Sequence, residues 1–453
     1  MIGDMVLLLD VLAGEVALFA AVMMLVGGID DLLVDALLWQ CGDAFRPLST
    51  LPAAPPLRYA VFVPAWHEAA VIGAMLEAAA SSYDLARLRL YVGCYPNDPA
   101  TLDAVRTIIP RSPAVRIVVG DRLGPTNKAD CLVTLWHAMR ADEAAGHARY
   151  DAVILHDAED CIDPAELSVF DHHLRHAAAV QLPVVPLIEP RRHWVSGGYA
   201  DEFAEAHMRT LVVRQALGAS LPLAGVGCAL RRDVLERIAA GDGEPFDASS
   251  LTEDYELGLR IGALGYPVTF VRWCNAQGSL IATSAYFPER FGASVRQRSR
   301  WIAGIALAGW DRTGWGRRHA AERWMRMRDR RGPLAALVIA LAYAALLLRS
   351  LSWLAHRLHG DWPPAVPSAV FALSIANLLL LSWRITIRVR CTAALHGRRE
   401  GLRSIPRLFV GNALLIAAVA TAMREYVRSL VTGRPLRWDK TEHRFPGVDC
   451  GTR

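Results

Sequence analysis

The stretch "ILHDAEDCIDP", residues 154–164, joins an apolar run to a cluster of acids. The run ends at Leu155, like a buried strand, and carboxylates follow at Asp157, Glu159, Asp160 and Asp163. Side chains at i and i+2 of an extended segment point to the same side, which pairs Asp157 with Glu159. Two such carboxylates repel each other unless a cation lies between them. We therefore expect this pair to bind a divalent metal, Mg²⁺ or Mn²⁺, which commonly bridges to substrate phosphates.

The other two acids of this stretch have a simpler explanation. Asp163 is best interpreted as a cap of the helix that begins near Pro164. Asp160 stays ambiguous between a capping role and a metal ligand.

Strand and helix patterns alternate around this stretch, across residues 57–332. Helical periodicity occurs in 70–80 and 129–141, and the expected strands are 58–63, 89–93, 115–119 and 152–156. This alternation predicts an α/β fold with a mostly parallel sheet, whose ligands bind at the carboxyl ends of the strands.

The composition indicates a soluble domain joined to membrane segments. Of 453 residues, 53% are hydrophobic and 21% charged, and the mean hydropathy is +0.23. Runs 5–27, 333–355 and 365–387 are long enough to span a bilayer. Asp10 and Glu15 inside the first run are expected to face other helices or to mark a snorkelling end. A signal peptide is disfavoured because no basic region precedes the run.

A shorter apolar run, 408–423, has arginines on both sides. If both flanks are cytoplasmic, the run cannot cross, so we expect it to lie along the cytoplasmic interface or to re-enter. The predicted domains are a transmembrane segment (1–40), a cytoplasmic domain (41–310), transmembrane and interfacial helices (311–430) and a cytoplasmic tail (431–453).

Net charge and cysteine content indicate which partners and which cellular compartment to expect. The net charge of +4 is small, and we expect no nucleic-acid partner. The eight cysteines include no C-x-x-C pair. This argues against a zinc site or a disulfide framework and fits a reducing compartment.

Other polar residues follow the expected strands. Glu68 lies past the first, Asp98 past the second, and Lys128 begins a helix after the third. A lone acid past a strand is usually a cap or turn residue. Together with the acids of residues 154–164, these residues make four polar clusters at the same edge of the expected sheet, which favours a binding site instead.

Two later segments also carry candidate chemistry. In "SLTEDYELGLRIGALGY" (250–266), Thr252 could cap a helix, whereas Asp254 could act as a general base. In "VRQRSRWIAGI" (295–305), Gln297, Arg300 and Trp301 share one helix face. That face could be an ordinary surface stripe, but it also suits a phosphate-bearing leaving group and a sugar ring.

The order of these motifs along the chain is typical of one protein family. The series "PAWHE", "PND", "NKAD", "DAE", "TED" and "QRSRW" resembles the membrane-bound family 2 glycosyltransferases with a GT-A fold, which include cellulose, chitin and hyaluronan synthases. The resemblance covers about residues 55–310. Segments 197–232 and 438–446 are similar to the bacterial NfrB group, inner-membrane glycosyltransferases first known from phage adsorption.

The resemblance implies roles for individual residues. Glu68 and Asp98 would contact the uridine of a UDP-sugar, and Lys128 would lie near its diphosphate. Asp157 and Glu159 would hold the metal, although the family usually has Asp where this chain has Glu159.

The same resemblance assigns the reacting end of the site. Asp254, with Glu253 beside it, would be the base, and segment 225–232 would form part of the acceptor-site wall. Gln297 and Trp301 would line the acceptor end, and Arg300 would stabilise the departing UDP.

The implied activity is inverting transfer from a UDP-sugar at the bacterial inner membrane, with a UDP-N-acetylhexosamine as one candidate donor. It would extend and secrete an envelope polysaccharide, with a growing glycan acceptor, membrane lipid and an outer-membrane or periplasmic export partner. The alternatives are a non-processive transferase that makes a lipid-linked sugar, and a non-catalytic envelope or receptor component. Relatives often continue into a cyclic di-GMP-binding domain, and we expect no such binding within these residues.

Overall fold

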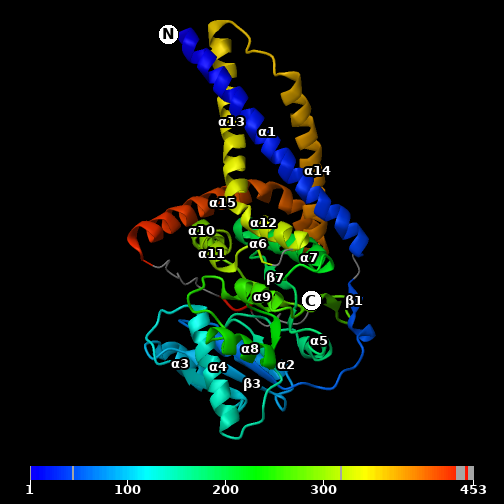
Figure 1. Cartoon of the computed structure of the whole chain (residues 1–453), viewed down its shortest axis with the longest axis vertical. Helices are drawn as coiled ribbons and strands as arrows, with labels where there is room; N and C mark the ends of the chain where they lie inside the picture. The colour runs from blue at the N-terminus through cyan, green and yellow to red at the C-terminus, as the bar shows by residue number, and fades with distance from the viewer. Residues whose placement is uncertain (1, 43–44, 317–318, 435–443, 447–453) are drawn as a thin grey trace.

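The computed structural model describes residues 2–42, 45–316, 319–434 and 444–446. In Figure 1, an elongated bundle of helices projects from a larger domain that contains the sheet, and helix α15 lies across the base of the bundle. The strands and helices of the larger domain position the candidate site.

The central sheet is mixed and mostly parallel. Its described strands follow the order β4-β3-β2-β5-β8-β6-β9, and β8 is antiparallel to both of its neighbours. The bounds are β2 Tyr59–Pro64, β3 Leu88–Cys94, β4 Val115–Val119, β5 Ala152–Leu155, β6 Ala179–Gln181, β8 Cys228–Arg231 and β9 Val268–Phe270. Two small sheets pair β1 (Arg46–Pro47) with β10 (Trp273–Cys274), and β7 (Val184–Leu187) with β11 (Thr283–Tyr286). The expected α/β fold and its first four strands are confirmed.

Each face of the sheet buries a separate core. Tyr59, Val61 and Val63 of β2 pack in one core, whereas Ala60 and Phe62 pack in the other. Alternate side chains of a strand point to opposite faces, so a strand covered on both sides is apolar at nearly every position. The covering helices are α2 Ile72–Ser82, α3 Pro99–Arg106, α4 Lys128–Ala144, α5 Glu166–His173, α8 Arg232–Asp242 and α9 Glu253–Ala263.

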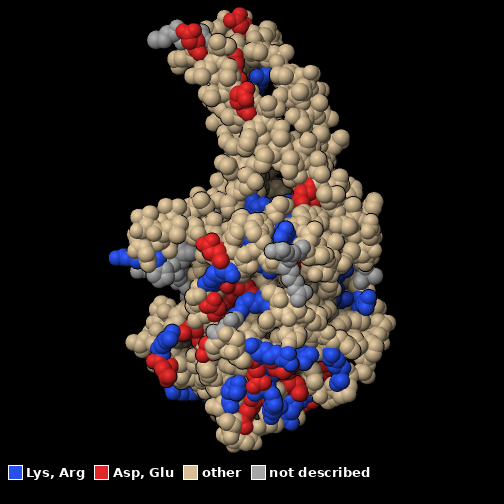
Figure 2. Space-filling model, viewed as in Figure 1, with Lys and Arg blue, Asp and Glu red and all other residues tan. Residues whose placement is uncertain are grey.

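Four described helices are long and apolar enough to cross a membrane. They are α1 Ile2–Cys41, α13 Gly332–His359, α14 Ser368–His396 and α15 Arg398–Thr432. The first three form the projecting bundle, and Figure 2 shows no charged side chain on the visible face of its middle part. Asp10 of α1 accepts a hydrogen bond from Ser352 and lies 3.0 Å from Nε2 of His356, so this acid faces a neighbouring helix as expected.

Helix α15 has a different orientation from the other three. It is longer than the expected run, and it packs against α6, α10, α13 and α14. Because it lies across the base of the bundle in Figure 1, its placement supports an interfacial helix over a fourth crossing helix. The remaining segments are η1 Leu48–Thr50, α6 His193–Glu205, η2 Ala206–Thr210, α7 Leu211–Ala216, α10 Phe291–Ile302, η3 Ala303–Leu307, α11 Ala308–Thr313 and α12 Ala320–Arg330.

Buried ion pairs join these helices to the larger domain. Arg209 of η2 is bound to Asp35 of α1, and Arg407 of α15 donates to both oxygens of Asp201 in α6. Burial raises the pKa of Asp201 to about 6, although Arg388 and Arg407 oppose this shift. Removing one partner of such a pair typically costs about 3–5 kcal/mol.

Candidate functional site

A cavity of about 470 Å³ lies at the carboxyl edge of the parallel strands. Because β3, β2 and β5 are parallel neighbours, the residues that follow them meet at this edge. All predicted site residues except Asp98 line the cavity: Glu68, Lys128, Asp157, Glu159, Glu253, Asp254, Gln297, Arg300 and Trp301.

A lysine and an acid form the centre of one side of the cavity. Asn127 caps α4 by accepting a hydrogen bond from the amide of Asp130. Nζ of Lys128 then lies 2.6 Å from Oδ1 of Asp157 and donates to the carbonyl of Gly225 at 3.0 Å. Burial would lower the pKa of Lys128, but nearby carboxylates, Asp157 first, raise it above its ordinary value. The cavity therefore contains a permanent positive charge.

Asp160, which also lines the cavity, contacts a buried histidine. Its Oδ2 lies 3.1 Å from Nδ1 of His156 and accepts the amide of Asp157 at 2.9 Å. Nε2 of the buried His156 lies 3.0 Å from Glu166. Burial would lower the pKa of His156, but Glu166 and Asp160 raise it to about 10, so this imidazole is cationic.

The rest of the loop corrects two expectations. Asp163 accepts the amide of Ala165 at 2.9 Å, but α5 begins at Glu166 with Ala165 at its N-cap and no side-chain capping bond. The expected capping role of Asp163 is therefore wrong, and its carboxylate stabilises the turn before the helix. Cys161 is disulfide-bonded, so the expectation of no disulfide framework in a reducing compartment is wrong at this position. Cys94, Cys131 and Cys228 are buried free thiols.

The donor set fits a metal that is shared with a diphosphate. Within the described ranges, no group of three or more His, Cys, Asp or Glu side chains could hold a metal ion. Mg²⁺ sites often use only one or two carboxylates, and substrate phosphates and water supply the remaining oxygens. Asp157 and Glu159, which both line the cavity, meet that requirement.

Two acids, Glu253 and Asp254, open α9 close to Lys128. Burial and the adjacent Asp254 raise the pKa of Glu253 to about 7. Burial also raises the pKa of Asp254, with Asp157 adding to the shift and Lys128 opposing it. Gly225 has φ +73°, and a Cβ there would lie 2.6 Å from Oδ2 of Asp254. A glycine at this position lets the backbone approach the acid.

Thr252 occupies the N-cap position of α9, but its hydroxyl makes no capping bond. The suggested capping chemistry of Thr252 is therefore wrong. Its side chain packs against Gly304 of η3, where a Cβ would lie 2.6 Å from both Cγ2 and Oγ1 of Thr252. The start of α9 is thus in tight contact with the helical segment that follows α10.

Helix α10 carries the third group of cavity residues. Gln297, Arg300 and Trp301 all face the cavity, as their spacing predicts. Arg298 instead pairs with Glu202, and burial lowers the pKa of Arg300. The two arginines of "QRSRW" therefore have separate roles.

Aromatic side chains form a wall beside Trp301. The ring of Trp301 lies edge-on to Tyr199, with centroids 6.0 Å apart, and close to those of Phe203 and Phe287. Sequence reasoning missed Phe203 and Phe287, which line the cavity, and also His207 of η2. Both π-helical turns, η2 and η3, contribute to the cavity. Such turns interrupt α-helices often at functional sites, but they leave no simple sequence signal.

Asp98 does not line the cavity, and it stabilises the backbone that precedes Glu68. It is 4% exposed, accepts the amide of His67 at 2.6 Å and caps α3 through the amide of Thr101. Burial acts to raise the pKa of Asp98, but hydrogen bonds from Thr101 and His67 lower it below its ordinary value. His67 has φ +55°, and Asp98 stabilises this uncommon conformation directly before Glu68.

The mixed sheet and its strand-end cavity define a GT-A-like domain, here joined to long apolar helices. A family model described as "Glycosyltransferase like family 2" matches residues 55–304, more than half of the chain. The chain belongs to this family of glycosyltransferases.

The chain is also similar to two curated proteins and to a solved structure. Bacteriophage adsorption protein B of Escherichia coli K12 and bacteriophage N4 adsorption protein B of E. coli O157:H7 are each 36% identical to it over 476 residues. These matches cover 97% of this chain and 63% of each relative. The mannosyltransferase PcManGT from Pyrobaculum calidifontis, in complex with GDP-Man and Mn²⁺, shares the fold at 18% identity and TM-score 0.53, covering 92% of this chain and 99% of that one.

Proposed function

We propose that this protein is a metal-dependent, inverting glycosyltransferase of the bacterial inner membrane that extends a glycan from a UDP-sugar. One observation carries the proposal: a single cavity brings together the cluster of Lys128 and Asp157, the acids of α9 and the polar face of α10. These groups supply a diphosphate site, a base and a leaving-group cation.

The mechanism is a single displacement. The carboxylate of Asp254 takes the proton from an acceptor hydroxyl, whose oxygen attacks the anomeric carbon while the bond to the diphosphate breaks. Lys128 and Arg300 neutralise the charge that develops on the departing UDP. A divalent metal held by Asp157 and Glu159 would neutralise more of that charge. Trp301 and the aromatic wall exclude water and offer a stacking face to the acceptor sugar.

The membrane topology follows from charge and placement. The larger domain lies at the same end of the bundle as the arginines of α14 and α15, which favours a cytoplasmic location for the cavity. The connection between α13 and α14 lies at the far end of the bundle (Figure 1). A single cysteine placed at position 360 should therefore be labelled from the periplasm, and one at position 440, outside the described residues, should not.

The decisive test is nucleotide release. The purified full chain, in detergent or nanodiscs, is screened with UDP-sugars and with GDP-mannose, the donor named for PcManGT. Metal-dependent UDP release from one donor is the expected result. No release from any donor would contradict the proposal, and GDP release would correct the nucleotide.

Product length separates extension from the transfer of one sugar. Radiolabelled donor should give a polymer if the protein extends a chain, and a short lipid-linked product if it does not. The names of the relatives refer to phage adsorption, and an envelope glycan would connect the proposed activity to that role. An Asp254→Asn strain that still adsorbs phage would favour the non-catalytic envelope component.

A further inference from the structure

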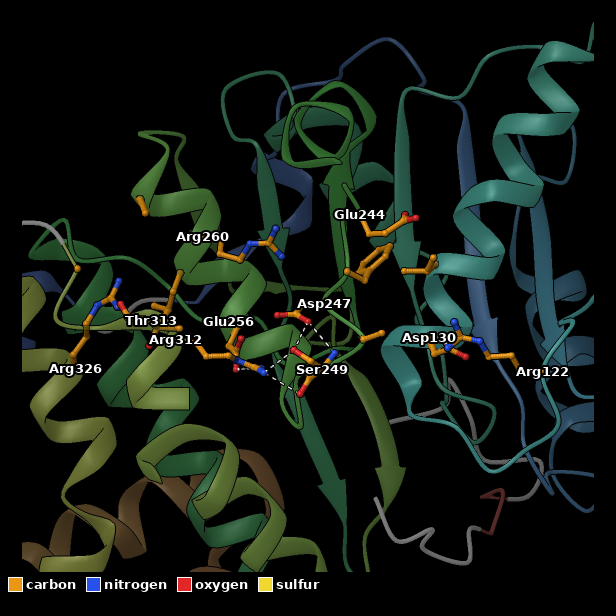
Figure 3. A pocket seen from close by; sticks show the side chains of 16 residues that line it. Arg122, Asp130, Glu244, Asp247, Ser249, Glu256, Arg260, Arg312, Thr313 and Arg326 are labelled. Carbon is orange, nitrogen blue, oxygen red and sulfur yellow. Dashed lines mark hydrogen bonds and ion pairs between the residues drawn. The ribbon is translucent and has the colours of Figure 1, made fainter. Parts of the chain in front are cut away.

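A second cavity, of about 710 Å³, lies beside the outer face of α9 (Figure 3). It shares no lining residue with the catalytic cavity. Figure 3 shows Asp247, Ser249 and Glu256 close to the guanidinium of Arg312 in this cavity. Arg312 belongs to α11, which continues from α10 through η3.

Arg312 binds two separate parts of the chain. Its Nη1 donates to the backbone oxygen and Oγ of Ser249, at 2.8 and 2.9 Å, and its Nη2 donates to Oε1 of Glu256 at 2.6 Å. Glu256 is 3% exposed, and burial raises its pKa even though Arg312 opposes the shift. A buried carboxylate with a charged partner is strongly destabilised when that partner is removed.

The hydrogen bonds continue from Glu256 toward the catalytic acids. Oγ of Ser250 donates to Oε1 of Glu256 at 2.8 Å and accepts the amide of Thr252 at 3.1 Å. Glu253 and Asp254 follow Thr252 directly. An unbroken chain of hydrogen bonds therefore runs from Arg312 to the backbone that presents these two acids.

We propose that Arg312 is a positioning residue, which orients Asp254 toward Arg300 by holding Glu256 and segment 249–252. The inference rests on the proposed function for the catalytic role of Asp254. Arg300 and Arg312 belong to one continuous helical unit, α10–η3–α11. This unit therefore positions Arg300, the leaving-group cation, directly, and it positions Asp254, the proposed base, through Glu256. Arg312 itself does not line the catalytic cavity.

The first experiment compares Arg312→Ala with Arg122→Ala. Both arginines line the second cavity, but Arg122 pairs with Asp130 of α4 and its side chain is 75% exposed. Arg312→Ala should lower kcat by about 100-fold, the scale expected when a reacting group shifts by about 1 Å. The KM for the donor and the Kd for UDP should stay unchanged, because Lys128 and Glu68 lie on other elements. Arg122→Ala should keep wild-type kcat, and Arg312→Lys should retain part of it, because lysine restores the charge without the planar fork.

The second experiment uses the cavity itself for chemical rescue. Because open space borders the guanidinium of Arg312, added guanidinium ion at a non-denaturing concentration should occupy the vacated position in Arg312→Ala. It should restore part of kcat in that variant, and neither urea nor guanidinium should restore Asp254→Asn. Wild-type kcat in Arg312→Ala, or a lost kcat that guanidinium leaves unchanged, would overturn the inference.

Hydrogen exchange tests the inference without relying on turnover. In Arg312→Ala, the amides of residues 249–254 should exchange faster than in the wild type and in Arg122→Ala, and guanidinium should slow them again. Unchanged exchange in this segment would sink the positioning role even if the enzyme is active. Faster exchange in a protein that releases no nucleotide from any donor would instead contradict the proposed function alone.

Discussion

The carboxylate of Asp160 lies 3.1 Å from Nδ1 of His156, although Asp160 lines the same cavity as Asp157 and Glu159. Asp160 is also 2% exposed, and its Oδ2 holds the amide of Asp157. A residue that neutralises a buried cation and orients a neighbouring backbone has little freedom to bind a metal. This relationship supports the pairing of Asp157 with Glu159.

Substitutions at 159 and 160 should therefore have different effects. Glu159→Gln should weaken Mn²⁺ binding in the presence of UDP by about tenfold or more, because even residues behind metal ligands cost that much. Asp160→Asn should mainly destabilise the fold, by about 3–5 kcal/mol, because it leaves His156 charged with one partner fewer. Calorimetric Mn²⁺ titration and thermal unfolding measure the two effects. Loss of metal binding in folded Asp160→Asn, with normal binding in Glu159→Gln, would reverse the assignment.

Asp254→Asn should abolish transfer while preserving nucleotide binding. Loss of a general base commonly costs about 10²–10⁴ in rate. UDP affinity should not fall, because the asparagine removes no contact proposed for the nucleotide. Asp103→Asn is a matched control, since Asp103 is an exposed acid paired with Arg106. Turnover near the wild-type level in Asp254→Asn would show that another group is the base.

The pH dependence of transfer should reflect the two acids of α9. Glu253 has its pKa raised to about 7, and that of Asp254 is raised as well. A base must be ionised, so kcat/KM should fall as Asp254 becomes protonated, at a pH above the ordinary range of an aspartate because burial raises its pKa. In Glu253→Gln the neighbouring negative charge is absent, which lowers the pKa of Asp254 and moves the rising limb to lower pH. A limb that stays in place or moves to higher pH would contradict this coupling.

Gly304→Ala should reduce activity with little change in donor affinity. The added Cβ would lie 2.6 Å from the side chain of Thr252 and would push the start of α9 away from α10. Gly292→Ala, in α10, is the control, because a Cβ there meets only Nη1 of Arg296 at 3.9 Å. Steady-state kinetics should show lower kcat in the first variant only. Equal kinetics in both variants would mean that this contact is not needed for catalysis.

Two adjacent glycines of α6 should respond in opposite directions. A Cβ at Gly197 would collide with the guanidinium of Arg407, whereas one at Gly198 meets nothing within 4 Å. Gly197→Ala should lower stability by about 1–3 kcal/mol, as overpacking usually does. Gly198→Ala should raise it by about 0.5–1 kcal/mol, because alanine loses less entropy in a helix. Thermal unfolding in nanodiscs measures both, and a stable Gly197→Ala would show that α15 can shift away from α6.

The sequence predicts the parts of this structure that depend on local pattern. Apolar runs followed by acids locate β2, β3 and β5 with Glu68 and Asp157, and helical spacing places Gln297 with Trp301. Contacts between distant segments are not predictable in this way. Arg209 and Asp35 are 174 positions apart, and nothing in either segment indicates the other. Asp98 and Asp160 look like ligands in sequence, but their partners, His67 and His156, are known only once the loops are folded.

The ion pair between Lys128 and Asp157 has a consequence for biogenesis. An ammonium group already balances the acid in the cavity before any nucleotide arrives, so the loop between β5 and α5 does not depend on a metal to offset like charge. Under the proposed function, the chain could then be synthesised and inserted in the bilayer independently of the supply of metal or sugar nucleotide. Under the proposed function, substrate arrival would thereby be separated in time from assembly, and newly made enzyme would remain folded while its donor is scarce.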